Sequence, residues 1–142
     1  MPPTPVLLRF TSATHAFWYQ VSGGLIGRSI FGAPILLLTV TGRKSGRTHT
    51  TPLIYLQDGD NFVIVGSVGG SDKHPAWFLN LRARPEAEVL VGRTRTRVRA
   101  EVANDEERAR LWPQLVKLYS NYDEYQKKTS RRIPVVILRP VS

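Results

Sequence analysis

Two glycine-containing turns constrain the fold of this chain more than any other feature of its sequence. Asp58-Gly59 lies between the β-type runs 50–56 and 61–65, and Gly92-Arg93 lies between the runs 87–91 and 94–102. Glycine readily adopts the positive φ that tight hairpin turns require, so such dipeptides between apolar runs indicate antiparallel strand pairs. Two hairpins in a chain of 142 residues therefore predict a small antiparallel sheet.

Two further strands complete the predicted sheet, and the strand at 94–102 shows how its two faces differ. Residues 34–40 are almost wholly apolar and predict a buried strand, and 133–138 predict the last strand. Within 94–102 the side chains alternate in character, which places two sets on opposite faces of a strand. One face carries Thr96, Val98, Ala100 and Val102, and the other carries Arg95, Arg97, Arg99 and Glu101.

Three other segments, at 5–21, 75–83 and 105–127, carry helix signals. The first mixes aromatic with polar positions and ends before two glycines, and the second begins with a proline, which suits a first helical turn. Asn104 and Glu107 have the spacing of a capping box at the start of the third. Proline lacks the N–H that a helix interior needs, so we expect Trp112-Pro113 to break or kink this helix.

Antiparallel hairpins with few helices predict an α+β protein built on a small closed or split β-barrel. About six antiparallel strands would form the barrel, with helices flanking them. The sequence shows no repeat, linker or low-complexity stretch, so we expect one domain over residues 1–142. Within it, 1–30 would form an N-terminal helical segment and 34–140 the barrel core.

Composition limits the chemistry that this chain can carry. It has no cysteine, which excludes disulfides, thiolate metal sites and cysteine nucleophiles. No cluster of histidine and carboxylate residues has the spacing of metal ligands, so we expect no metal. The formal net charge of +9 favours an anionic partner, which is nucleic acid, an acidic membrane surface or a multiply charged small ligand. We expect neither a secretory signal nor a spanning helix, since no run reaches ~18 apolar residues.

The first candidate site is the turn Thr41-Gly42-Arg43-Lys44-Ser45-Gly46-Arg47. Its glycines expose backbone N–H groups and its basic side chains supply charge-assisted donors, a combination that suits a phosphate. The spacing is not that of a nucleotide-binding P-loop. The other interpretation is a solvated basic hairpin turn.

The second candidate site is the segment 66–77, where a strand ends, small residues follow and a helix begins. Backbone donors near a helix N-terminus bind anions readily, and Lys73 adds a positive charge there. The same residues also fit an ordinary loop between a strand and a helix. Trp77 and Phe78 fit the core better than a ligand contact, and His74 fits a polar loop position.

Two sets of like side chains recur at regular spacing. Tyr119, Tyr122 and Tyr125 stand three residues apart, which keeps them on one side of a helix. They fit either packing on the barrel or a pocket for a flat, partly polar substrate. The arginines of 93–99 suit contact with nucleic-acid phosphates, although a solvated strand face is the commoner role of such a row.

Several separated motifs resemble the deazaflavin-dependent nitroreductase family and occur in the order found in that family. They are T-G-R-K-S-G-R, P-L-I-Y-L-Q-D-G-D, G-G-S-D-K-H-P-A-W-F-L-N-L-R-A-R-P, D-E-E-R-A-R-L-W-P-Q-L-V-K-L-Y-S-N-Y-D-E-Y-Q and I-P-V-V-I-L-R-P. The resemblance covers about residues 34–140. It implies a split β-barrel related to reductases that bind flavin mononucleotide, with coenzyme F420 rather than flavin mononucleotide as the cofactor.

The resemblance also implies an activity. It indicates an F420H2-dependent oxidoreductase that transfers hydride to a hydrophobic acceptor such as a quinone or a nitroaromatic compound. Members of this type come from mycobacteria and related actinobacteria, and some associate with the inner face of the membrane. We therefore expect a cytoplasmic protein and consider peripheral membrane contact through the N-terminal segment.

Residue by residue, the resemblance implies coenzyme contacts in the basic turn, in the strand after it, and in the loop and helix over 67–80. The matching positions are Arg43, Lys44, Ser45, Gly46, Thr51, Pro52, Ser67, Gly69, Gly70, Lys73, Trp77 and Asn80. The acceptor would contact Tyr119, Tyr122 and Tyr125. Ser67 and Tyr122 match the family residues that hydrogen-bond the reacting oxygens. Val68 and His49 stand where the nitroimidazole-activating member carries basic residues.

Two other functions are compatible with the composition. One is a basic nucleic-acid binder without catalysis, and the other is a barrel that holds a lipid or a flavin without turnover. Aromatic residues do not interleave with the arginine row, as a stacking platform for nucleic acid requires. Binding of a coenzyme with a phosphodiester and several glutamates already explains why a net charge of +9 is useful to this chain. We therefore expect an anionic deazaflavin and a small hydrophobic acceptor as partners, and no nucleic acid.

Overall fold

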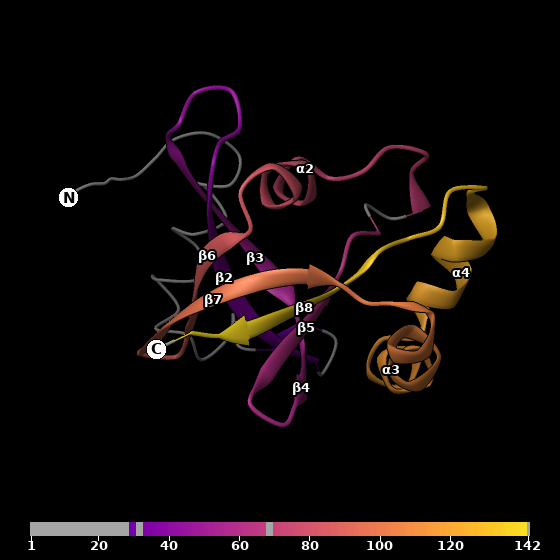
Figure 1. The fold of residues 1–142 in the computed structure, drawn as a ribbon. Helices are drawn as coiled ribbons and strands as arrows, with labels where there is room; N and C mark the ends of the chain where they lie inside the picture. Colours follow the sequence, from indigo (N-terminus) through magenta and orange to yellow (C-terminus); the bar gives the residue numbers. More distant parts are fainter. Residues whose placement is uncertain (1–28, 31–32, 68–69, 142) are drawn as a thin grey trace.

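The computed structural model describes residues 29–30, 33–67 and 70–141 (Figure 1). Its strands are β1 (Ser29–Ile30), β2 (Ala33–Thr41), β3 (Thr48–Ile54), β4 (Leu56–Asp58), β5 (Asn61–Val65), β6 (Glu86–Val91), β7 (Thr94–Val102) and β8 (Val135–Pro140). Its helices are α2 (Ala76–Ala83), α3 (Asp105–Leu118) and α4 (Asn121–Lys128).

The strands form one curled antiparallel sheet, in which each strand pairs with neighbours that run the opposite way. The order is β1-β2-β6-β7-β8-β5-β4, and β3 also pairs with β2. β3 contacts β5 without a ladder between these two strands, so the sheet curls into an incomplete barrel. Figure 1 shows α2 over one end of the sheet, with α3 and α4 side by side at its flank. The predicted class, an α+β split β-barrel with flanking helices, is confirmed.

Both predicted hairpins are confirmed. β4 and β5 pair with Asp58 opposite Asn61, and β6 and β7 pair with Val91 opposite Thr94. Gly59 has φ 61° and Gly92 has φ 60°. These left-handed values are easy for glycine and strained for other residues, so local chemistry alone places both turns.

The single strand predicted over 50–56 is wrong, because the chain changes partners at Tyr55. β3 ends at Ile54 and pairs with β2 from Thr41↔Thr48 to Ile35↔Ile54. β4 begins at Leu56 and pairs with β5 instead. Between them, Tyr55 is buried and its N–H donates to the carbonyl of Pro34 at 3.1 Å. Strand propensity is continuous across this point, so only the choice of partners reveals the boundary.

Of the break or kink predicted at Trp112-Pro113, the break is wrong, because α3 continues through Pro113 to Leu118. Proline has no N–H, so the Ala109 carbonyl lacks the helical hydrogen bond that residue 113 would otherwise donate. Pro113 and Ala109 are both exposed, so water can hydrogen-bond this carbonyl instead. The interruption falls instead at 119–120, before α4 begins. The helix starts as predicted.

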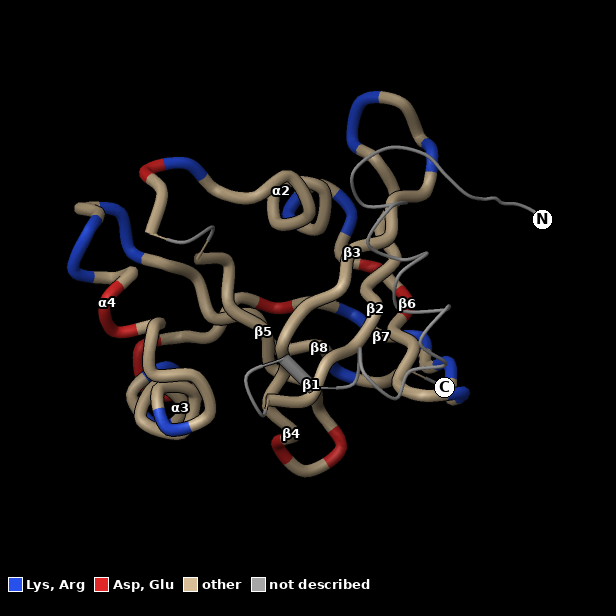
Figure 2. The backbone as a smooth tube through the Cα atoms, turned by 180° about the vertical axis from the view of Figure 1, so that it is seen from behind, with Lys and Arg blue, Asp and Glu red and all other residues tan. Residues whose placement is uncertain are grey.

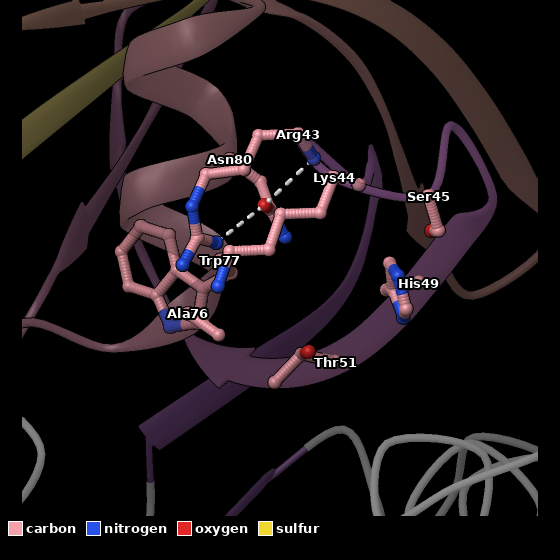
Figure 3. Close-up of a pocket in the computed structure, with 9 residues that line it drawn as sticks. Arg43, Lys44, Ser45, His49, Thr51, Ala76, Trp77 and Asn80 are labelled. Carbon is pink, nitrogen blue, oxygen red and sulfur yellow. Dashed lines mark hydrogen bonds between the residues drawn. The ribbon is translucent and has the colours of Figure 1, made fainter.

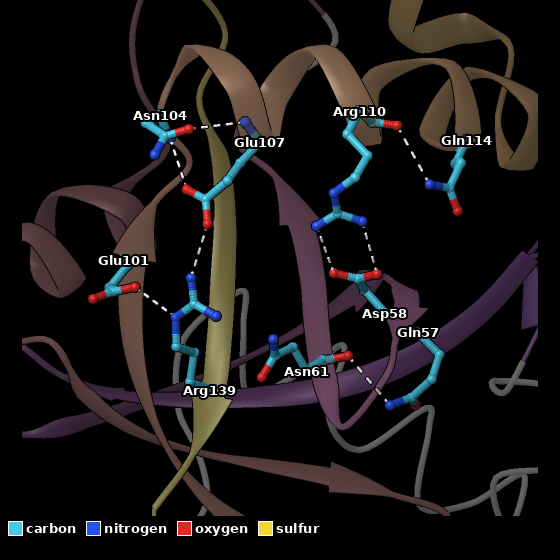
Figure 4. Close-up of polar contacts among 9 residues, drawn as sticks. All are labelled: Gln57, Asp58, Asn61, Glu101, Asn104, Glu107, Arg110, Gln114 and Arg139. Carbon is cyan, nitrogen blue, oxygen red and sulfur yellow. Dashed lines mark hydrogen bonds and ion pairs between the residues drawn. The ribbon is translucent and has the colours of Figure 1, made fainter.

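The capping box at the start of α3 is confirmed, and ion pairs fasten the helix to the sheet (Figure 4). Asn104 Oδ1 accepts from the Glu107 N–H at 2.8 Å, and Glu107 Oε1 accepts from the Asn104 N–H at 3.0 Å. Arg110 donates to both carboxylate oxygens of Asp58, at 3.1 and 3.0 Å. Arg139 of β8 donates to Glu107 at 3.0 Å.

The N-terminal segment predicted over 1–30 falls almost wholly outside the described residues. So do the helix predicted over 5–21 and any membrane contact made by this segment. The two described residues, Ser29 and Ile30, are not helical but form β1, antiparallel to Ala33 and Pro34. Among the helices that the structure describes, none is long and apolar enough to cross a membrane.

Two hydrophobic clusters bury opposite faces of the central strands. One fills the barrel and includes Ile64, Val136 and Leu138 together with Trp77 and Phe78 of α2. The other lies under α3 and α4 and comprises Val63, Val65, Leu111, Leu115, Tyr122, Ile133, Val135 and Ile137. Because both faces of β5 and β8 are covered, these strands are apolar at successive positions rather than alternating. The prediction that Trp77 and Phe78 are core residues is confirmed.

The arginine face of β7 is solvated, as the alternation predicts. Arg95, Arg97 and Arg99 are all exposed. Arg95 pairs with Glu88 at 3.0 Å and Arg99 pairs with Glu86 at 2.5 Å, both across to β6. Exposed pairs of this kind contribute little to stability, and here they neutralise part of the basic row.

Candidate functional site

A pocket of about 250 Å³ lies between the β2–β3 turn and α2 (Figure 3). Its lining comes from two segments, 42–51 and 76–80, which the fold brings together. Six lining residues are among those predicted to bind the coenzyme: Arg43, Lys44, Ser45, Thr51, Trp77 and Asn80. Gly42, His49 and Ala76 also line the pocket and are not among them. Gly42 and Ala76 adjoin predicted positions, so sequence spacing alone carries a signal for these two.

The β2–β3 turn is closed by its own backbone, which changes the expected source of anion donors. The Gly42 N–H donates to the Arg47 carbonyl at 2.7 Å, and the Gly46 N–H donates to the Gly42 carbonyl at 2.9 Å. The Arg47 N–H donates to Ser45 Oγ at 3.1 Å. Because these N–H groups are used within the turn, the basic side chains are the main donors that it can offer a ligand.

Two neighbouring side chains crowd position 42 of the turn. A Cβ there would lie 2.8 Å from His49 Nε2 and 2.9 Å from Ser45 Oγ. Gly46 has φ 73° and open space around it, so its requirement is conformational. Gly46 therefore shapes the turn away from the pocket, whereas Gly42 lines it.

Asn80 links the turn to α2. Its Oδ1 accepts from the backbone N–H of Arg43 at 3.0 Å and from Arg43 Nη1 at 2.7 Å. Both partners are donors, which fixes the amide with its oxygen toward Arg43. Asn80 is only 6% exposed, and its Nδ2 has no hydrogen-bond partner among the described residues. A buried amide N–H without a partner is costly, so a ligand atom in the pocket would satisfy it.

Positive charge collects around the turn. Figure 2 shows Lys and Arg gathered at the end of the β2–β3 hairpin, close to α2. Lys44 and Arg47 are exposed, and neither side chain forms an ion pair with a carboxylate of the described residues. Glu86 and Glu88 of β6 pair with arginines of β7, and Glu107 of α3 pairs with Arg139 of β8. An anion entering the pocket therefore meets uncompensated charge.

The N-terminus of α2 adds backbone donors to the pocket. Pro75 precedes the helix and makes no side-chain cap, and the first turn carries no acidic residue. The Phe78 and Leu79 N–H groups bond the Pro75 carbonyl, whereas Ala76 and Trp77 line the pocket. The first N–H groups of a helix have no partner within it, and together with the helix dipole they favour an anion.

None of the described residues of the loop before α2 lines this pocket. Ser67 is half-buried and Lys73 is exposed, and neither lines the pocket; nor do Pro52, Gly46 and Gly70. Gly70 has φ 85°, and a Cβ there would lie 2.9 Å from the carbonyl oxygen of Tyr125. The structure thus accounts for glycine at position 70 by close packing on α4. Val68 and Gly69 lie outside the described residues.

The three tyrosines form one cluster but do not share one helix, so that part of the prediction is wrong. Tyr119 is the C-cap residue that follows α3, whereas Tyr122 and Tyr125 belong to α4. The hydroxyls of Tyr119 and Tyr125 lie 3.1 Å apart, and Asn121 Nδ2 donates to Tyr119 at 3.0 Å. The rings of Tyr119 and Tyr122 meet edge to face at 5.0 Å.

Tyr122 differs from the other two because it lies in the core. It is 5% exposed and packs among the apolar residues beneath α3 and α4. Burial raises the pKa of its hydroxyl, with Tyr119 and Tyr125 adding to the effect. The hydroxyl has no hydrogen-bond partner among the described residues. This environment favours a packing role for Tyr122 over the catalytic role predicted for it.

Comparisons with known proteins agree with the geometry. The family model for the F420H(2)-dependent quinone reductase matches residues 11–140. An F420H(2)-dependent quinone reductase from Mycobacterium tuberculosis is 44% identical over 128 residues, which is 87% of this chain and 86% of that protein. A solved F420-H2 dependent reductase is 39% identical with a TM-score of 0.70, covering 75% of this chain and 94% of the other.

More distant structures share the fold alone. A heme storage protein from Vibrio cholerae is 10% identical with a TM-score of 0.59, over 76% of this chain and 82% of that one. The family model, by contrast, matches residues 11–140, a span that includes the basic turn, the loop before α2 and the helices α3 and α4. The chain belongs to the F420H(2)-dependent quinone reductase family and is an F420-dependent oxidoreductase.

Proposed function

We propose that this protein transfers hydride from reduced F420 to a quinone, with nitroaromatic compounds as a second class of acceptor. The pocket between the β2–β3 turn and α2 would bind the phosphodiester part of the coenzyme. The observation that carries this assignment is the buried amide of Asn80, whose Nδ2 has no partner among the described residues and lies in a pocket lined by Arg43 and Lys44.

The residues present fit the coenzyme in charge and in size. Ligand pockets commonly enclose about 300–1,000 Å³, so one of about 250 Å³ suits one part of the coenzyme rather than the whole of it. Its donors are two basic side chains, the Asn80 amide and the start of α2, all of which favour an anion. Thr51 and Trp77 also line the cavity.

F420H2 supplies the hydride when it is bound, so the protein need supply only binding, orientation and polar contacts. Arg43, held by Asn80, would keep its guanidinium directed at the coenzyme phosphate. Ser67 has no hydrogen-bond partner for its hydroxyl among the described residues, so that hydroxyl is available to donate to an acceptor oxygen. The linked hydroxyls of Tyr119 and Tyr125 would form the polar edge of the acceptor site.

Two titrations test the proposed coenzyme. Fluorescence titration with oxidised F420 and, separately, with flavin mononucleotide should give a lower dissociation constant for F420, because its longer anionic tail meets the basic turn. Added salt should weaken F420 binding more than flavin mononucleotide binding. Equal or inverted affinities would contradict the assignment of this pocket.

Turnover provides the matching test of the acceptor. Oxidation of F420H2, followed by absorbance, should be accelerated by a soluble naphthoquinone and, more weakly, by a nitroaromatic compound. A protein that binds F420 but oxidises F420H2 no faster with a quinone present would refute the proposed acceptor class.

A further inference from the structure

A single guanidinium ties the loop between β5 and α2 to the segment before β8. Arg131 Nε donates to the Ser71 carbonyl at 2.7 Å. Its Nη2 donates to the carbonyls of Gly66 at 3.0 Å and Ser67 at 2.9 Å. Its Nη1 lies 3.1 Å from His74 Nδ1. One side chain thus contacts the loop at both ends, across as many as 65 positions of sequence.

Two further links hold the same loop. Thr129 Oγ1 donates to Asp72 Oδ1 at 2.6 Å and accepts from the Arg131 N–H at 3.2 Å. The Gly66 N–H donates to the Pro134 carbonyl at 3.0 Å. The segment 129–134 therefore contacts the loop with backbone and side chains together, and Arg131 makes most of these contacts.

The segment that carries Arg131 is itself anchored to α3 and α4. Gln126 Nε2 donates to the Arg131 carbonyl at 2.8 Å, and the Ile133 N–H donates to Gln126 Oε1 at 2.9 Å. Arg108 of α3 donates to Gln126 Oε1 at 3.1 Å and to the Ile133 carbonyl. A continuous polar network therefore runs from α3, through α4, to the loop before α2.

The chemistry of this contact requires arginine. A guanidinium presents five N–H donors in a rigid plane, whereas a lysine ammonium is a single charged point on a flexible stem. Carbonyl oxygens of Gly66, Ser67 and Ser71 surround Arg131, and no carboxylate lies within ion-pair distance of its guanidinium among the described residues. A half-buried cation held chiefly by backbone carbonyls serves to fix the path of that backbone.

We propose that Arg131 is a positioning residue for the reductase site, which it serves by holding the loop that carries Ser67 and leads into α2. The carbonyl of Ser67 is held by Arg131, while the Ser67 hydroxyl is left without a described partner. At the other end of the loop, α2 places Ala76 and Trp77 in the pocket lining. The functional part of this inference rests on the proposed coenzyme and acceptor sites, whereas the clamp itself does not.

The clamp is tested first in the coenzyme-free protein. Arg131→Gln and Arg131→Lys should speed amide hydrogen exchange within 66–74, because neither side chain can bridge the same three carbonyls. Arg132→Gln is the matched control, since Arg132 is the neighbouring residue and pairs only on the surface with Asp105 at 2.8 Å. Exchange in 66–74 that stays as slow in both Arg131 variants as in Arg132→Gln would overturn the clamp, whatever the protein binds.

The functional consequence is tested by binding and turnover. Arg131→Gln and Arg131→Lys should each raise the F420 dissociation constant and lower kcat for a quinone, by about tenfold for the loss of charge-assisted contacts. Arg132→Gln should leave both unchanged. Wild-type protein that fails to bind F420 would refute the proposed function, whereas Arg131 variants that match Arg132→Gln in both readouts would refute this inference.

A double-mutant cycle separates positioning from a general loss of stability. If Arg131 acts through Ser67, then Arg131→Lys should lower kcat much less in a Ser67→Ala background than in the wild type. Fully additive effects of Arg131→Lys and Ser67→Ala on kcat would overturn the proposed coupling. Because lysine retains the positive charge, Arg131→Lys serves this test even if Arg131→Gln does not fold.

Discussion

The amide oxygen of Asn80 accepts hydrogen bonds from both the backbone N–H and the guanidinium of Arg43, at 3.0 and 2.7 Å. These residues are 37 positions apart and belong to the two segments that line the pocket. One buried side chain therefore sets the distance between the basic turn and α2. It also directs the charge of Arg43, so the shape and the charge of the site depend on the same contact.

Replacing Asn80 should therefore affect both folding and binding. In Asn80→Ala the Arg43 N–H loses its acceptor in a part-buried place, which costs on the order of 1–3 kcal/mol of unfolding free energy. F420 affinity should also fall, because the Arg43 side chain is no longer held. Chemical denaturation and F420 titration measure the two effects. Gln114→Ala, which removes one exposed contact to the Arg110 carbonyl at 3.3 Å, should change neither.

Lys44 should matter for binding alone. It is exposed at the end of a turn, so Lys44→Ala should leave the melting temperature unchanged. Loss of one charge-assisted contact to a phosphate should weaken F420 binding by about 1.5–3 kcal/mol, or roughly tenfold to a hundredfold. Arg97→Ala removes the same charge from the exposed face of β7 and is the control. If both variants bind F420 equally well, the pocket does not hold the phosphate.

Tyr122→Phe distinguishes a core residue from a catalytic one. The hydroxyl of Tyr122 is buried without a described partner, so its removal should leave the protein as stable as before or more stable. We expect quinone turnover to change little, whereas Tyr125→Phe, which breaks the hydroxyl pair with Tyr119, should lower it. Thermal melts and steady-state kinetics on both variants decide. A drop on the order of a hundredfold in kcat for Tyr122→Phe would restore its predicted catalytic role.

His74 should make stability depend on pH. Burial, and then the positive charges of Arg131 and Arg82, hold the pKa of His74 below its ordinary value of 6.5. As the pH falls below about 6.5, the unfolded chain therefore takes up a proton before the folded protein does, and stability decreases. Denaturant unfolding over about pH 5 to 8 should show this decrease, and His74→Gln should reduce it. An unchanged slope in His74→Gln would assign the effect to other groups.

The parts of the fold that the sequence predicts are those that short-range chemistry controls. Gly59 and Gly92 adopt left-handed φ, Asn104 and Glu107 cap each other across three positions, and the arginines of β7 point away from the core. Each of these features depends on residues within one turn or one strand. The basic turn is recognisable for the same reason, because its glycines and charges lie together in the sequence.

Other predictions fail where the outcome depends on a distant partner. The β-type sequence at 50–56 is continuous and gives no sign of the change of strand partner at Tyr55. Pro113 lies inside α3 because the helical turn around it faces water. The spacing of the tyrosines predicts one helix face, but packing on β5 and β8 buries Tyr122. No local pattern distinguishes Arg131 from the exposed Arg132 next to it.

By itself, then, the sequence determined two hairpins, their turns and a charge that suits an anionic coenzyme. Only the tertiary structure decided which of the predicted residues lie together in one pocket. Asn80 meets Arg43 across 37 positions, and Arg131 meets Ser67 across 64. Such contacts form only when the curled sheet brings α2, α4 and the loops between them together, since a hydrogen bond acts over about 3 Å whatever the distance along the chain.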